Sequence, residues 1–169
     1  MSSKLDNQAK SNKPFIFRDT REHEGNGWIF DKDKLFAGTQ TMGLKTGDYT
    51  VETLETKLCI ERKGSLTEFV QNLIQKRFQA ELKRMMEFEY RHVVLEFSAE
   101  DLMRYPHTSA VPYKVRRSTK MTGSFLFKRT IEFQMAYGIH FWFAGTCGKS
   151  IAKSLIKRTW ESEYGSDLF

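Results

Sequence analysis

The stretch from Gly47 to Lys63 constrains the fold of this chain more than any other. It predicts two short antiparallel strands joined by a polar turn. Side chains alternate along a strand, so Glu61 and Lys63 share one face and Arg62 points to the other. An antiparallel return can bring Asp48 toward Glu61. Two carboxylates and a lysine held in this way predict a site for a hard divalent cation, with the lysine beside a developing anion or a nucleophilic water.

Strands and helices alternate along the rest of the chain. Short apolar runs with strand propensity are typical of buried strands and occur at residues 15–17, 92–97 and 139–143, and we expect residues 39–45 to form a strand or the approach to one. Apolar residues at helical spacing predict helices at residues 66–88, 124–137 and 148–160. This alternation predicts an α/β fold with a central mixed β-sheet flanked by helices.

The composition is that of a globular domain. Of the 169 residues, 40% are hydrophobic and 14% aromatic, which is enough to build a core. Residues 1–13 are polar and predict a disordered tail, because they hold too few apolar side chains to pack. We expect a single domain over residues 14–169.

Positive charge is concentrated in one part of the chain. Between Leu102 and Ile131 there is no acid, and the seven basic residues there exceed the net charge of +6. Such a stretch predicts a polyanionic partner, of which nucleic acid is the first candidate. A solvated basic loop is the simpler alternative. Residues 98–123 hold two prolines and predict a long irregular loop that is mobile without DNA.

Several other site classes are excluded. Cys59 and Cys147 are far apart and lack C-x-x-C spacing, so they predict buried packing residues and no disulfide or zinc site. The loop at 145–150 resembles a P-loop, but Phe143 stands where its first glycine is needed. The N-terminus lacks the apolar segment of a signal peptide, and no apolar run could cross a membrane. We therefore expect a cytoplasmic, nucleoid-associated protein or one from another reducing intracellular compartment, not a secreted or membrane protein.

Three motifs, in order, resemble those of the XPF-type structure-specific endonucleases. Gly47-Asp48-Tyr49 followed by Glu61-Arg62-Lys63 is similar to the GDY and ERK signatures of that family. Upstream, the segment 18–22 contains a D-x-R-E motif, and downstream the segment 77–84 is similar to the helix after the ERK strand. The resemblance runs from Pro14 to the C-terminus and concerns the nuclease domain alone.

The resemblance implies a restriction-endonuclease-like fold and metal-dependent cleavage of DNA phosphodiesters near branches or single-strand/double-strand junctions. It implies Mg²⁺, with Mn²⁺ able to substitute, held by Asp19, Asp48 and Glu61, and Lys63 as the fourth catalytic residue. From the residues alone, Asp19 is better explained as a helix N-cap or turn aspartate. The residues expected to support the site are Arg21, Glu22 and Arg62. The residues expected to contact nucleic acid are Lys76, Arg77, Lys114, Arg116, Arg117 and Lys120.

The chain departs from the family pattern at one position. The pattern E-R-K-x-x-x-D ends at Thr67 here, and Glu68 is expected to point elsewhere on the helix. Thr67 favours a second hypothesis, a nucleic-acid-binding module that kept the fold but lost the chemistry. We also expect no tandem helix-hairpin-helix region of the kind that many family members carry. The basic loop, a partner protein or a homodimer would then supply the DNA-binding contacts.

Overall fold

The computed structural model describes residues 13–22, 25 and 27–165. The predicted tail therefore lies outside the described residues, apart from Lys13, whose Nζ donates a hydrogen bond of 2.6 Å to the Asp33 carbonyl. The strands are β1 (Ile16–Asp19), β2 (Thr39–Met42), β3 (Tyr49–Val51), β4 (Leu58–Lys63), β5 (Tyr90–Leu95) and β6 (His140–Phe143). The helices are α1 (Leu66–Leu73), α2 (Lys76–Met85), α3 (Ala99–Met103), α4 (Tyr113–Ser118), α5 (Gly123–Tyr137) and α6 (Gly148–Tyr164), with a 3₁₀ turn, η1 (Gly145–Cys147), before α6.

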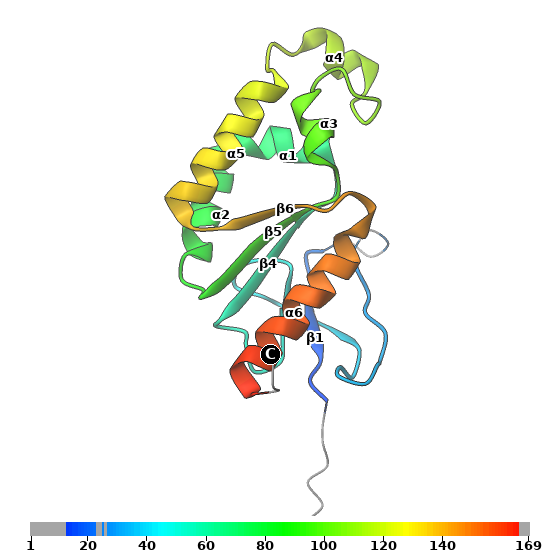
Figure 1. Ribbon diagram of the computed structural model, residues 1–169, viewed down its shortest axis with the longest axis vertical. Helices are drawn as coiled ribbons and strands as arrows, with labels where there is room; N and C mark the ends of the chain where they lie inside the picture. The colour runs from blue at the N-terminus through cyan, green and yellow to red at the C-terminus, as the bar shows by residue number, and fades with distance from the viewer. Residues whose placement is uncertain (1–12, 23–24, 26, 166–169) are drawn as a thin grey trace, which may run out of the picture.

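The six strands form one mixed sheet in the order β2-β1-β3-β4-β5-β6. The central strands β1, β3 and β4 pair antiparallel to one another, and parallel pairs flank them on both sides. Helix α6 covers one face, while α1, α2 and α5 cover the other (Figure 1). The predicted α/β class and mixed sheet are confirmed.

Alternation along β4 divides the core between the two faces. Leu58 and Ile60 pack toward α6, whereas Cys59 packs toward α1, α2 and α5. Both packing layers are rich in aromatic side chains, which accounts for the high aromatic content of the sequence. Because the same alternation continues to the end of the strand, Glu61 and Lys63 follow Cys59 to the α1–α2 side.

The predicted helix over residues 66–88 is two helices. The backbone leaves the helical conformation at Gln75, which is extended with a ψ of 133° and precedes α2. Leu73 and Phe78, on either side of the break, are both buried in the same core. The apolar spacing therefore continues across the break, and spacing alone could not detect it.

Three further predictions are corrected. Residues 98–123 are not irregular, because they contain α3 and α4 and bury Leu102 and Val111. Strand β6 is only partly buried, since it lies at the edge of the sheet. Cys147 is exposed in the turn before α6, whereas Cys59 is buried as predicted.

Gly123 fixes the start of α5 against α3. A Cβ at this position would lie 2.0 Å from the Met103 carbonyl oxygen, so only glycine allows the two backbones to approach so closely. The Gly123 N–H also donates a 2.9 Å hydrogen bond to the Tyr105 carbonyl.

Within the described residues, no helix has both the length and the apolar composition needed to span a bilayer.

Gly123→Ala should lower the free energy of unfolding by about 1–3 kcal/mol, because backbone atoms on both sides must move to admit the methyl group. Urea unfolding followed by circular dichroism measures the change. Gly43→Ala is the matched control, since nothing lies within 4 Å of a Cβ there. Equal stability of Gly123→Ala and the parent chain would show that α5 does not approach α3 as described.

Candidate active site

The sheet topology brings the predicted acids to one end of three neighbouring strands. Asp48 directly precedes β3, and its N–H donates a 2.8 Å hydrogen bond to the Ile60 carbonyl of β4. On its other side, the Asp48 carbonyl accepts a 2.8 Å hydrogen bond from the N–H of Asp19, the last residue of β1. The backbone of Asp48 is thus held between both neighbouring strands.

Gly47 permits this approach. Its φ is +79°, a left-handed conformation that favours glycine, and a Cβ there would lie 2.5 Å from the Cys59 Sγ. The glycine of the GDY motif therefore has a steric role, which is to let Asp48 turn into the site.

A polar cavity of about 330 Å³ lies over the end of β4, between the sheet and helices α1 and α2. Asp48, Glu61 and Lys63, three of the four predicted catalytic residues, line it together. The other lining residues are Arg21, Glu22, Gly47, Glu68, Asn72, Gln75, Arg77 and Glu81.

The positive charge around the carboxylates of Asp48 and Glu61 is too small to balance them. Burial raises the pKa of Asp48 to about 7, although one of its oxygens accepts a 2.7 Å hydrogen bond from the Arg62 N–H. Burial, together with the nearby Asp48 carboxylate, raises the pKa of Glu61 well above its ordinary value. A cation bound between them would relieve both effects.

Lys63 is the cation that the chain itself supplies. Its Nζ donates a 2.7 Å hydrogen bond to Glu61 and lies 5.1 Å from the centre of the Phe78 ring. Burial alone would lower the pKa of Lys63, but the carboxylates of Glu61 and Glu81 more than offset it and raise the pKa. The lysine therefore stays charged, and its remaining N–H donors are available to an anionic oxygen in the cavity.

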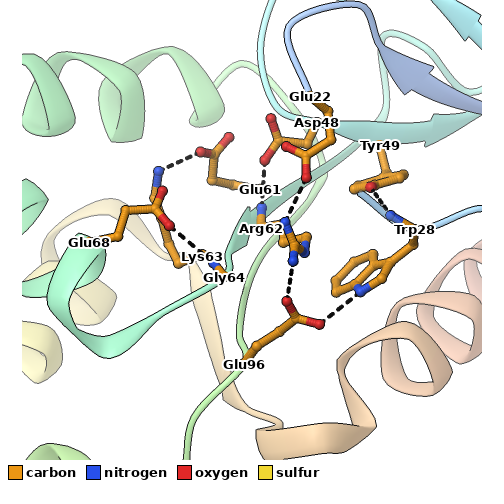
Figure 2. A network of polar contacts seen from close by, with 10 residues as sticks. All are labelled: Glu22, Trp28, Asp48, Tyr49, Glu61, Arg62, Lys63, Gly64, Glu68 and Glu96. Atoms are coloured by element: carbon orange, nitrogen blue, oxygen red, sulfur yellow. Dashed lines mark hydrogen bonds and ion pairs between the residues drawn. The ribbon is translucent and has the colours of Figure 1, made fainter. Parts of the chain in front are cut away.

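Arg62 points to the opposite face of β4, as predicted, and organises a second polar cluster (Figure 2). It pairs with Glu22 at 2.7 Å, another of the residues expected to support the site, and also with Glu96. Its guanidinium lies 5.4 Å from the centre of the Trp28 ring, and the Trp28 indole donates a 2.9 Å hydrogen bond to Glu96. The cluster ties β4, the end of β5 and the segment after β1 together.

The structure places Asp19 apart from the cavity. Its buried carboxylate accepts hydrogen bonds from the Arg21 backbone at 2.8 Å, the Arg21 Nε at 2.6 Å and the Leu44 backbone at 2.6 Å. Burial alone would raise the pKa of Asp19, but these hydrogen bonds lower it overall. Within the described part of the chain, no three His, Cys, Asp or Glu residues cluster closely enough to hold a metal ion. Metal ligation by Asp19 stays a prediction.

Glu68 corrects the expectation that it points elsewhere. It lines the cavity, whereas Thr67 does not. Ser65 caps α1 by accepting a 3.2 Å hydrogen bond from the Glu68 N–H, and the Glu68 carboxylate accepts one of 3.2 Å from Gly64 (Figure 2). These two hydrogen bonds hold the Glu68 side chain against Gly64, directly after β4. The Ser-x-x-Glu signature was the sequence signal that could have located it.

The six predicted nucleic-acid contacts form two groups. Lys76 and Arg77 begin α2, and Arg77 lines the cavity. The other residues lie on α4 or directly after it and do not line the cavity: they are Lys114, Arg116, Arg117 and Lys120. The ion pairs found in the described part of the chain include none of these six residues.

Comparisons with known proteins agree with this architecture. The family model of the ERCC4 domain matches residues 18–150. A structure of XPF from Aeropyrum pernix, 19% identical, superimposes with a TM-score of 0.56 over 88% of this chain and 67% of that one. A second, XPF from Aeropyrum pernix in complex with DNA, is also 19% identical, with a TM-score of 0.58 over 92% of this chain and 69% of that one. No curated protein matches the chain. The predicted fold, similar to that of restriction-endonuclease-like nucleases, is confirmed.

Without divalent cations, Asp48→Asn should stabilise the protein above neutral pH. The pKa of Asp48 rises from an ordinary value of 3.8 to about 7, so the unfolded chain ionises this group first. The stability of the parent chain should therefore fall between these pH values and then level off, whereas asparagine cannot ionise. We expect a gain on the order of 2 kcal/mol at pH 8 that vanishes near pH 4. Urea unfolding in EDTA measures it, and an identical pH dependence of both proteins contradicts the burial of this charge.

Proposed function

The chain belongs to the ERCC4 domain family, and we propose that it is a metal-dependent endonuclease that hydrolyses DNA phosphodiester bonds in the cavity over the end of β4. The observation that carries the proposal is the pair of buried carboxylates, Asp48 and Glu61, beside the charged Lys63. Burial of such ionised acids costs folding free energy. Groups with strongly shifted pKa values in a cavity are typical of functional sites.

The side chains that line the cavity are of the chemical type that binds a hard divalent cation, although in the described residues no three of them cluster closely enough to hold an ion without moving. Asp48, Glu61 and Glu68 offer carboxylate oxygens, which are the ligands that Mg²⁺ and Mn²⁺ prefer. The raised pKa values of Asp48 and Glu61 indicate the missing positive charge. When bound, such an ion lowers the pKa of a water molecule and neutralises charge on the phosphate. For Asp19 to join the ligands, Arg21 would have to release its carboxylate.

The residues of the chain then have distinct tasks. Lys63 directs its free N–H donors at the phosphate oxygens, and Glu61 orients it through their 2.7 Å contact. Arg77, on the α2 side of the cavity, contacts a neighbouring phosphate. The Arg62 cluster acts indirectly, because its pairing with Glu22 fixes the segment that borders the cavity.

The proposed substrate is DNA with a branch or a single-strand/double-strand junction. One similar structure, of XPF from Aeropyrum pernix, is a complex with DNA. The two groups of basic residues in this chain are suited to contact separate parts of such a substrate. We also propose that a homodimer or a partner protein adds further DNA contacts. The protein would act in a reducing intracellular compartment.

The second candidate is a nucleic-acid-binding module without catalytic activity. The observation that favours it is the Asp19 carboxylate, whose oxygens are engaged by Arg21 and Leu44. Thr67 favoured it from the sequence, but Glu68 supplies a carboxylate to the same cavity. A cleavage assay on duplex, single-stranded, flap and forked DNA with Mg²⁺ or Mn²⁺ separates the two candidates.

Glu61→Gln should lower the cleavage rate on the order of 100-fold or more and leave DNA affinity nearly unchanged, because the loss falls on the transition state. Single-turnover cleavage of a forked substrate and fluorescence anisotropy measure the two quantities. Glu89→Gln, at an exposed position, is the matched control and should cleave normally. Full activity of Glu61→Gln would refute the site.

Glu68→Gln should raise the Mg²⁺ concentration needed for half-maximal cleavage about ten-fold, since one carboxylate that fits the cation is lost. Glutamine can still accept the Gly64 N–H, so the start of α1 should be preserved. Thr67→Asp should bring no gain, because Thr67 does not line the cavity. The opposite pattern, a gain from Thr67→Asp and no effect of Glu68→Gln, would place the missing carboxylate at residue 67.

A further inference from the structure

The most basic part of the chain presents an exposed aromatic ring. Helices α3 and α4 with their connections, residues 99–122, form a lobe at one end of the molecule (Figure 1). Tyr113 opens α4 and is 66% exposed. The guanidinium groups of Arg116 and Arg117 each lie 5.8 Å from the centre of its ring. A single exposed aromatic residue is common, but a ring flanked by two cations is partly fixed in orientation before any ligand arrives.

The lobe rises from the sheet edge that carries the active site. Strand β5 is the parallel neighbour of β4, with Leu95 paired to Lys63, and α3 begins four residues after β5 ends. The carboxyl ends of both strands therefore point toward the lobe, as Figure 1 shows. Gly123, through its close approach to Met103, secures the far end of the lobe to α5. The cavity and the lobe thus both lie toward the carboxyl ends of β4 and β5.

The lobe also carries a shallow surface depression, which Tyr113 does not line. A cavity of about 470 Å³ opens between α3 and the start of α5, and Arg104, His107 and Ser124 are among the residues that line it. These side chains can donate hydrogen bonds to phosphate or sugar oxygens. Acidic side chains are absent from its lining.

We propose that Tyr113 stacks on an unpaired base of single-stranded nucleic acid, while Arg116 and Arg117 contact the phosphates beside it. In a duplex both faces of each internal base are already covered, so the ring adds affinity only where a strand is unpaired. Stacking uses the face of the base and not its edge, so it tolerates any sequence. The inference rests on the proposed function for the identity of the substrate as DNA, and it makes the lobe the element that detects the single-stranded side of a junction.

Binding of oligo(dT) and of a blunt duplex to the full chain carrying Glu61→Gln, which prevents cleavage from interfering, tests the proposal. Tyr113→Ala should weaken binding of the single strand about ten-fold and leave binding of the duplex unchanged. Tyr113→Phe keeps the ring and should bind as the parent does. Tyr164→Ala, at another exposed tyrosine, on α6 (51% exposed), is the control and should have no effect.

Two further measurements distinguish stacking from charge. A strand containing 2-aminopurine should lose fluorescence on binding, and Tyr113→Ala should abolish part of that quenching. Tyr113→Ala should leave the slope of log affinity against log salt unchanged, whereas Arg117→Ala should flatten it by about 0.7 for its lost phosphate contact.

Equal losses on single strand and duplex, or no loss with Tyr113→Ala, would overturn the proposal. A parent chain that cleaves no DNA while Tyr113→Ala still loses single-strand affinity would refute the endonuclease and leave the stacking site standing.

Discussion

The site depends on the alternation of side chains along β4. Because consecutive residues of a strand point to opposite faces, Glu61 and Lys63 enter the cavity while Arg62, between them, enters the cluster with Glu22 and Glu96. One strand end therefore supplies both the chemistry and its support. A shift of register by one residue would exchange the two sets and destroy both.

The price of this arrangement is burial of like charges at one strand end. The raised pKa values of Asp48 and Glu61 indicate that the ionised carboxylates lose favourable solvation by water when the chain folds. Large apolar layers on both faces of the sheet supply the stability that offsets it. The charged Lys63 offsets part of the negative charge in this cavity.

Local patterns predicted the two faces of β4 correctly. The alternation of residues along 58–63 was enough to assign Glu61 and Lys63 to one face of β4 and Arg62 to the other. Contacts between distant segments were not accessible in this way. Trp28 meets Glu96 across 68 positions of sequence, and no local signal links them. Helices α3 and α4 have only five and six residues, too few for an apolar period to emerge.

The cavity has walls of two kinds. On the sheet side, Asp48 and Glu61 are fixed by backbone hydrogen bonds to neighbouring strands. On the helix side, Glu68 and Arg77 stand on separate helices, divided by the extended backbone at Gln75. The position of Glu68 therefore depends on the hydrogen bonds at the start of α1, whereas the positions of Asp48 and Glu61 depend on strand pairing.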